Sequence, residues 1–312
     1  MVKLKNKKRL AWALKQHETG KGTVPEMASL CGVTPRRFRQ VSAVYRRSGL
    51  VPRIGQQVGR PRAVLPEEHR EIIRDVYQRY RLNALYLEKV IYAEQGIRIP
   101  HNRIHRMLLS EGLAAREPNK AKRRKPWIRY EREHSLSAGH LDWHIPAEGP
   151  KVCVVLDDAS RKILSGGEFT EATAEHSVAL VKTVLDTYGH IRILRESITD
   201  HGSQFYANKR DEEGKAAHLF ELFLAEHNVR HILCRYNHPQ SNGKIEKWFD
   251  LYKKHRSRFK TFEEFITWYN NRPHGSLNLR RAETPEQAFW RKMPPEYYYR
   301  IATRFFEVVC RE

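Results

Sequence analysis

The stretch Leu141-Asp-Trp-His-Ile-Pro-Ala-Glu-Gly-Pro-Lys-Val-Cys-Val-Val-Leu156 decides the fold of the second half of this chain. Two short apolar runs, residues 141–145 and 152–156, flank a segment with two prolines and a glycine, which is typical of two strands joined by a hairpin turn. Asp142 stands inside the first run, and a carboxylate in a buried strand is costly unless a cation meets it. The stretch therefore predicts a β-hairpin with a candidate site on its first strand.

Outward from this hairpin, the apolar pattern predicts the other elements of an α/β domain. Strands are expected over 162–169, 195–199 and 229–234, and helices over 174–188, 218–227 and 243–255. Three strands in series, followed by helix, strand, helix, strand and helix, describe a mixed five-stranded sheet with flanking helices.

Two further acidic residues stand at chemically useful places in this pattern. Asp200 directly follows the fourth expected strand, at a carboxyl end, where α/β sheets place ligands. Glu246 lies one turn into the helix that begins at Gly243. If the first and fourth strands are neighbours, Asp142 and Asp200 converge and this helix can deliver Glu246. Taken singly, each is more often an ordinary surface carboxylate, but three oxygen donors together suit Mg²⁺ or Mn²⁺. Two such ions can stabilise a displacement at phosphorus.

The motifs around these residues resemble those of a known family. Residues 140–290 are similar to the integrase catalytic core of insertion-sequence transposases, akin to retroviral integrases. The resemblance is carried by Leu141-Asp-Trp-His144, Thr199-Asp-His-Gly-Ser-Gln-Phe205 and His238-Pro-Gln-Ser-Asn-Gly-Lys-Ile-Glu246, with residues 268–274 and 284–288 similar to the family's tail. With the basic helical units before the core, it covers nearly the whole chain.

The resemblance implies a ribonuclease-H-like fold in which Asp142, Asp200 and Glu246 are the catalytic, metal-holding residues of a DDE motif. Such enzymes activate water for DNA strand cleavage and then the freed 3′-hydroxyl for strand transfer, with Mg²⁺ as cofactor and Mn²⁺ as substitute. Lys253, two helical turns after Glu246, matches a basic residue of the family and is expected to contact DNA, as is Asn242.

The chain departs from the family's pattern in two places. His201 stands where the family usually has asparagine after the second aspartate. Forty-five residues separate Asp200 from Glu246, a longer spacing than in the retroviral relatives, and we assign the additional residues to a charged surface loop at 206–215. Asp157 and Asp158 are rival carboxylates, for which we favour a structural role or one that supports the site indirectly.

The first part of the chain is strongly basic. Residues 1–130 hold 30 Lys and Arg against 10 Asp and Glu, whereas the remainder is nearly balanced, so that most of the net charge of +21 lies here. This distribution favours a nucleic-acid-binding module attached to a near-neutral one, with a merely basic, soluble surface as the plainer alternative.

Residues 23–41 have the layout of a helix-turn-helix. Thr23 and Thr34 are placed to cap two helices, Gly32 to form the turn, and Ala28 and Leu30 to face inward. The second helix would then present basic side chains to a DNA groove, although simple helix packing is the alternative. The expected contacts are Arg36, Arg37 and Arg39.

Two basic linkers complete the expected DNA contacts. Arg60 and Arg62 flank Pro61 and suit a narrow minor groove, or equally a solvated linker. A run after residue 120 favours phosphate contacts by Lys122, Arg123 and Arg124. A second helical unit is expected over 66–113. Its histidines at 101 and 105 are four apart, but no cysteine pair follows at ligand spacing, so we prefer a surface role over zinc binding.

The predicted organisation has five parts: a helix-turn-helix domain over 1–58, a second helical DNA-binding unit over 59–118, a basic linker over 119–133, the catalytic core over 134–292 and a tail over 293–312. The four cysteines are scattered without CxxC, which favours reduced thiols. No segment is long and apolar enough for a membrane span. We therefore expect a prokaryotic cytoplasmic protein associated with the nucleoid.

We expect the partners to be double-stranded DNA, as element ends and as target, and further copies of the chain. The predicted function is that of a transposase. Two alternatives remain open: a helix-turn-helix transcription regulator, which would leave three carboxylates without a task, and a structure-selective nuclease on the same fold, which would cleave DNA without joining it. Metal-dependent nicking separates the regulator from the enzymes, and transfer of a 3′ end separates the nuclease from the transposase.

Overall fold

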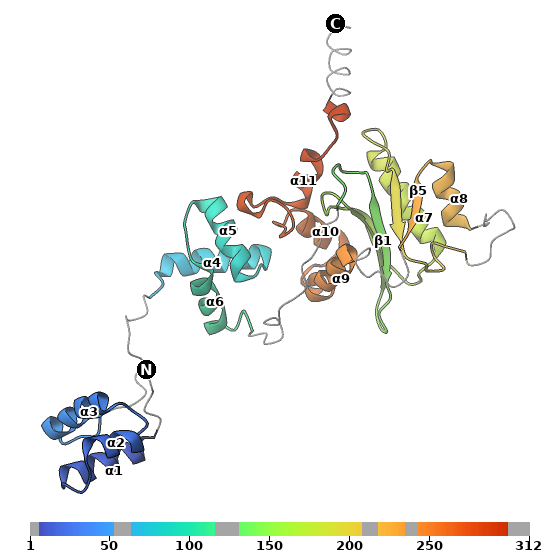
Figure 1. Cartoon of the computed structure of the whole chain (residues 1–312). Helices are drawn as coiled ribbons and strands as arrows, with labels where there is room; N and C mark the ends of the chain where they lie inside the picture. The colour runs from blue at the N-terminus through green and yellow to red at the C-terminus, as the bar shows by residue number, and fades with distance from the viewer. Residues whose placement is uncertain (1–5, 53–63, 116–130, 208–217, 235–242, 299–312) are drawn as a thin grey trace. The chain divides into compact units, whose positions relative to one another are not determined.

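The computed structural model describes residues 6–52, 64–115, 131–207, 218–234 and 243–298 (Figure 1). The chain divides into two compact units, residues 1–64 and residues 65–312. Each unit has its own hydrophobic core, and each is described by itself below.

The first unit is a bundle of three helices, α1 (Lys7–Glu18), α2 (Val24–Leu30) and α3 (Pro35–Ser48). Thr23 and Glu26 form a reciprocal capping box at the start of α2, and Gly32 makes the turn to α3 with a φ of +62°. Ala28 is fully buried as expected, but Leu30 is 43% exposed, so its predicted inward orientation was wrong. The α2 residue that packs in the core beside Ala28 is Met27 instead.

The second unit begins with three helices, α4 (Glu67–Tyr80), α5 (Ala84–Gln95) and α6 (His101–Ser110). The residues that follow α4 and α5 and cap them, Arg81 and Gly96, both adopt the left-handed conformation that terminates a helix. The apolar residues of the three helices form one core, which includes Ile73 and Val76 as expected from the sequence. The other faces of α6 are polar and exposed.

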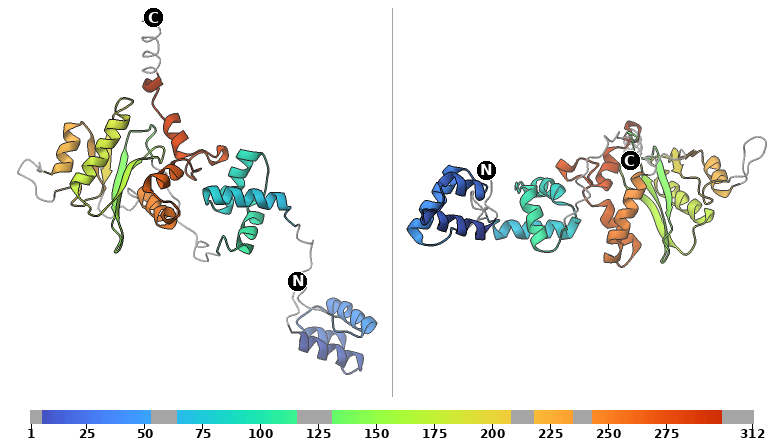
Figure 2. Two further views of the ribbon diagram at one scale, coloured as in Figure 1. Left: turned by 180° about the vertical axis from the view of Figure 1, so that it is seen from behind. Right: turned by 60° about the horizontal axis from the view of Figure 1, so that its bottom comes forward.

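A five-stranded sheet with the order β3-β2-β1-β4-β5 follows (Figure 2). Its strands are β1 (Gly139–His144), β2 (Lys151–Asp157), β3 (Ile163–Phe169), β4 (Glu196–Thr199) and β5 (Arg230–Leu233). The first three pair antiparallel, whereas β4 pairs parallel to β1 and β5 parallel to β4. This topology confirms the predicted mixed sheet of ribonuclease-H-like type, including the pairing of the first and fourth strands.

Helices cover both faces of the sheet (Figure 1). Side chains of α7 (Ala174–Tyr188) and α8 (Leu219–Glu226) share a core with Leu141 and Cys153. On the other face, α9 (Gly243–His255) and α10 (Phe262–Asn270) pack on Val152 and Val154. Because successive strand residues point to opposite faces, Asp142 lies on the face that α9 covers.

The segment after α9 packs against the α4–α6 helices. Besides α10, this segment contains η2 (Arg256–Arg258), η3 (Leu279–Arg281) and α11 (Pro285–Arg291). Leu279, the first residue of η3, belongs to the hydrophobic core of α4–α6. The indole N–H of Trp268 donates to the carbonyl of Arg79 (2.8 Å), and the Arg272 guanidinium donates to the carbonyl of Tyr80. Side chains of the later segment thus satisfy carbonyl groups at the C-terminal end of α4.

The predicted division into five parts stays a prediction. Its first two boundaries, at 58 and 118, lie outside the described residues. Within the described part of the chain, no helix is both long enough and apolar enough to cross a membrane.

Candidate active site

The parallel pairing of β1 and β4 brings the first two predicted site residues to one edge of the sheet. Gly139 pairs with Ser197, and His140 pairs with Ile198. Two residues further along each strand stand Asp142 and Asp200, so the sheet places these two carboxylates side by side. The sequence predicted this convergence on the condition that the strands are neighbours, which they are.

Asp200 lies in a tight turn directly after β4. Its carboxylate oxygen Oδ1 accepts a hydrogen bond from the backbone N–H of Gly202 (2.9 Å). A Cβ atom at Gly202 would come within 3.0 Å of the same oxygen and within 2.6 Å of the Gln204 amide oxygen, so a larger residue here would displace these two side-chain ends. The Thr199 hydroxyl, bonded to Nε2 of His231 on β5, fixes the strand end before it.

Helix α9 carries the third predicted residue, Glu246, in its first turn. The helix is held on the sheet by Ile245, Trp248 and Phe249, which are buried against β2. Trp248 and Phe249 are thus core residues rather than exposed aromatic groups. Glu246 itself is exposed, and the ring of Phe249 contacts His144 of β1 at 5.4 Å between centroids.

The three carboxylates influence one another electrostatically. Burial and the negative charges of Asp200 and Glu246 together raise the pKa of Asp142 to about 7, against a hydrogen bond from the Trp143 backbone that lowers it. A cluster of negative charge in a partly buried place is the setting that a divalent cation would stabilise.

The donor set fits a hard divalent ion in its chemistry. All three side chains offer carboxylate oxygens, the ligands that Mg²⁺ and Mn²⁺ take, and none brings a thiol or imidazole. As they stand, no three acidic, histidine or cysteine side chains of the described residues are grouped closely enough to enclose one ion. The carboxylates are therefore near neighbours in an open arrangement.

Asp158, for which the sequence favoured a structural role or one that supports the site indirectly, contacts residues that neighbour the site. Asp158 follows β2, is fully buried, and accepts a hydrogen bond from Nε2 of His140 (2.6 Å). The ammonium of Lys244, in the first turn of α9, forms an ion pair with the same carboxylate. No local pattern in the sequence indicated this pair, because its partners lie 86 residues apart.

Asp157 has a local task. Its two carboxylate oxygens accept from the backbone N–H of Leu136 (2.8 Å) and from both the N–H and the hydroxyl of Ser160 (2.8 and 2.6 Å). It thus organises the turn between β2 and β3, consistent with the structural role favoured from the sequence.

The predicted DNA contacts are distributed over both units. Arg36, Arg37 and Arg39 are exposed on α3. Lys253 is 55% exposed on α9. Burial lowers the pKa of the His144 imidazole, and the nearby positive charge of Lys253 lowers it further. The other predicted contacts, Arg60, Arg62, Lys122, Arg123, Arg124 and Asn242, lie outside the described residues, as does most of the predicted loop at 206–215.

His101 and His105 of α6 do not belong to any group of three potential metal ligands among the described residues. Nδ1 of His101 is 2.8 Å from a carboxylate oxygen of Glu88, and His105 is exposed.

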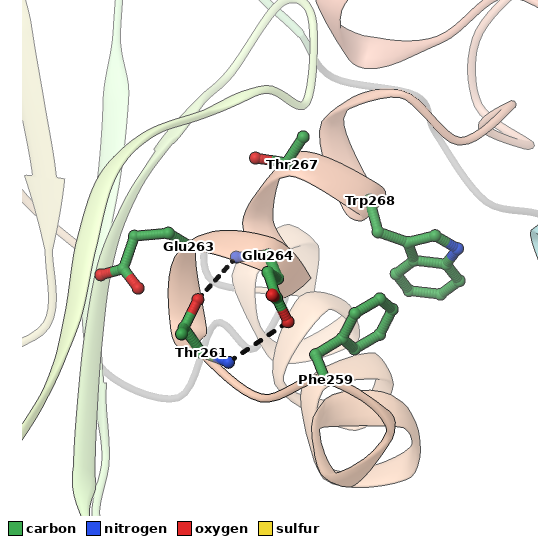
Figure 3. A pocket seen from close by; sticks show the side chains of 6 residues that line it. All are labelled: Phe259, Thr261, Glu263, Glu264, Thr267 and Trp268. Carbon is green, nitrogen blue, oxygen red and sulfur yellow. Dashed lines mark hydrogen bonds between the residues drawn. The ribbon is translucent and has the colours of Figure 1, made fainter.

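A shallow hollow on the surface lies beside α10 (Figure 3). It is lined by Phe259, Thr261, Glu263, Glu264, Thr267 and Trp268. Glu264 and Thr261 are engaged in the capping box that starts α10, with Glu264 accepting from the Thr261 backbone and its own N–H donating to the Thr261 hydroxyl (Figure 3). No lining residue belongs to the elements that carry the three carboxylates.

No protein-family model matches the chain. An uncharacterised protein of Caenorhabditis elegans is 25% identical over 163 residues, which are 49% of this chain and 12% of that protein. A protein of Spiroplasma virus SpV1-C74 named "Putative integrase ORF3" is 28% identical over 101 residues, 31% of this chain and 28% of the relative. The chain therefore spans only a small part of the length of these relatives.

Among solved structures, the catalytic core domain of BIV integrase has 15% identity and a TM-score of 0.36, covering 50% of this chain and 95% of that one. The sheet order described above confirms the predicted fold class, and part of this chain is similar in sequence to a viral protein named as a putative integrase, in line with the resemblance predicted from the motifs.

Proposed function

We propose that this chain is a transposase that binds the ends of its mobile element and performs metal-dependent DNA strand cleavage and strand transfer. The observation that supports this most is the alignment of Asp142 and Asp200 on adjacent parallel strands, with Glu246 on the helix that covers the same face. The similarity to a protein named as an integrase supports the same class of reaction.

In this proposal, each of the three carboxylates has a defined task. Asp142, Asp200 and Glu246 would hold two Mg²⁺ ions, which supply stabilisation of the attacking and leaving oxygens of an in-line displacement at phosphorus. The turn at Gly202 keeps the Asp200 carboxylate directed by a backbone hydrogen bond. The core contacts of Trp248 and Phe249 hold the helix that presents Glu246.

DNA binding would be shared between the two units. The exposed arginines Arg36, Arg37 and Arg39 lie along α3, the second helix of the helix-turn-helix, which is the helix that enters the major groove in such motifs. Lys253 extends the basic surface of α9 beyond Glu246 and is suited to a phosphate of the reacting strand.

The test is a cleavage and joining assay with the full chain. A labelled duplex that ends in the terminal repeat flanking the gene is incubated with the protein, Mg²⁺ and a target plasmid. We expect a strand break at the repeat end and covalent transfer of that end into the plasmid, both absent with Asp142→Asn. Breaks without joined product would favour the nuclease alternative. Sequence-specific binding without breaks under any divalent ion would favour the regulator.

A further inference from the structure

Asp158 connects three separate parts of the chain through one carboxylate. It is fully buried directly after β2. Its Oδ1 accepts from Nε2 of His140 on β1 (2.6 Å) and pairs with the ammonium of Lys244 on α9, and its Oδ2 accepts from the backbone N–H of Arg132. These donors favour the charged form and hold the pKa of Asp158 below its usual range, although burial opposes them.

Lys244 differs from the other lysines of its helix in exposure. Its side chain is 14% exposed, whereas that of Lys247, one turn later, is 78% exposed and pairs with Asp250 on the surface. Taking an ammonium out of water is costly, and pairing with a buried carboxylate at best roughly offsets that cost. A buried pair therefore adds little net stability, but it does fix geometry, because moving the Lys244 ammonium away removes one of the charged partners of the buried Asp158 carboxylate.

The pair joins the two elements that carry candidate metal ligands. His140 precedes Asp142 by two residues, so both side chains lie on the face of β1 that α9 covers. Lys244 precedes Glu246 by two residues in the same helical turn. Because His140 of β1 and Lys244 of α9 both contact Asp158, a shift of the first turn of α9 relative to β1 would disturb one of these two contacts.

We propose that Asp158 and Lys244 are positioning residues: their ion pair holds the first turn of α9 against β1 and thereby sets the separation between Glu246 and Asp142. This role rests on the proposed function and extends it, because it makes the affinity for the divalent ions depend on a pair of residues that are not ligands. Groups that orient metal ligands from behind typically change metal affinity about 10- to 100-fold when they are removed.

The test measures Mn²⁺ binding to the full chain by titration calorimetry, with thermal melting as a second measurement. We expect Lys244→Met to weaken Mn²⁺ binding at least about tenfold. Lys247→Met, the matched control one turn away, should bind as the unaltered chain does. Lys244→Arg keeps the charge and should restore part of the affinity.

A second variant covers the case in which Asp158 without the Lys244 charge unfolds the protein. The double variant Asp158→Asn/Lys244→Met removes both buried charges. We expect it to fold, but its affinity for Mn²⁺ should remain lower than that of the unaltered chain. Near-normal affinity in this folded variant would overturn the positioning role.

The remaining outcomes are equally decisive. A lower melting temperature with unchanged Mn²⁺ affinity would show a purely structural pair and overturn the proposal. Weaker binding of end DNA at unchanged Mn²⁺ affinity would make Lys244 a DNA contact instead and would also overturn it. No Mn²⁺ binding by the unaltered chain would overturn the proposed function, and the positioning role with it.

Discussion

Asp142 and Asp200 occupy equivalent positions on adjacent parallel strands, each two residues beyond the paired residues His140 and Ile198. This relationship depends on the backbone register of β1 and β4 and on the turn that places Asp200 directly after β4. Two carboxylates fixed in this way repel each other, which contributes to the raised pKa of Asp142, to about 7. Their separation is a property of the fold, so a ligand that bridges them needs little rearrangement of the backbone.

Replacement of any of the three carboxylates should abolish strand cleavage. Asp142→Asn, Asp200→Asn and Glu246→Gln keep the side-chain volume but remove a charged metal ligand. We expect each to lower the cleavage rate by about 1000-fold or more, equivalent to roughly 4 kcal/mol of barrier, with end-DNA binding largely intact. Single-turnover cleavage and a binding titration measure the two effects.

The matched control for these variants is Asp250→Asn, an exposed carboxylate on α9 that pairs with Lys247. It should cleave at the normal rate. A triad variant that cleaves as well as this control does not lack a ligand, and its residue would leave the proposed site.

Activity should depend on Mg²⁺ or Mn²⁺ and not on zinc. The proposed ligands are all carboxylate oxygens, a donor set for hard divalent ions. EDTA should stop cleavage, and added Mg²⁺ should restore it, whereas a chelator selective for zinc should have no effect. Inhibition by the zinc chelator would instead direct attention to His101 and His105.

Much of the fold could be predicted because its elements are marked by local patterns. The hairpin prolines, the apolar alternation and the glycine after the helix at 174–188 all correspond to observed boundaries. The helices α10 and α11 were not predicted, although each begins with a capping box, formed by Thr261 with Glu264 and by Thr284 with Gln287. That spacing is a usable sequence signal for a helix start.

The part that could not be predicted depends on contacts between distant residues. Lys244 resembles any lysine of an exposed helix until Asp158, far away in the sequence, meets it. Trp268 and Arg272 lie in a segment that the sequence marked only as similar to the family's tail, and no local pattern indicated that their side chains donate hydrogen bonds to carbonyl groups at the end of α4. Such pairings are set by tertiary packing, which no local pattern records.

Lys253→Ala should impair strand transfer more than folding. The ammonium stands two turns after Glu246 on an exposed part of α9, and its charge reaches His144, two residues from Asp142. An exposed lysine contributes little to stability, so the melting temperature should change little. Joined product per bound end, measured on end duplexes, should fall several-fold.

The neighbouring exposed lysine supplies the control for this prediction. Lys254→Ala removes the same charge from the same helix at a position turned by about 100°. Equal effects of the two substitutions would mean that only the overall charge of α9 matters.

His255 should make the protein less stable as the pH falls below 6.5. It is buried against Trp268, with ring centroids 5.4 Å apart. Burial lowers its pKa to about 4, helped by the nearby charges of Arg272, Lys254, Arg258 and Arg81. Between pH 6.5 and 4 the unfolded chain therefore binds a proton that the folded chain does not, and stability decreases as the pH falls.

His255→Phe keeps the ring contact and removes this titration. The decrease in unfolding free energy across that window should become shallower by up to about 1.4 kcal/mol per pH unit. Denaturant titrations at several pH values measure it, with His105→Phe on an exposed position of α6 as the control. Parallel pH profiles for both variants and the unaltered chain would contradict the assignment to His255.

The last prediction concerns the division of labour between the two units. Residues 1–64 form a compact unit with its own core and carry fifteen Lys and Arg against two acidic residues. As a fragment, they should bind the element's end duplex more tightly than a scrambled duplex. Affinity should fall steeply with salt, by about 10³-fold between 50 and 200 mM if about six phosphates are neutralised.

A triple variant that replaces Arg36, Arg37 and Arg39 by alanine tests which surface makes these contacts. The three side chains lie on exposed positions of α3, so the fold should survive their loss. We expect binding to weaken, the salt dependence to become shallower, and the preference for the end sequence to disappear, because base-reading and phosphate contacts would be lost together. Retention of the sequence preference in the triple variant would move specific recognition from α3 to another element. Specific binding by residues 65–312 alone would assign end recognition to the second unit, where the exposed polar face of α6 is a candidate DNA-binding surface.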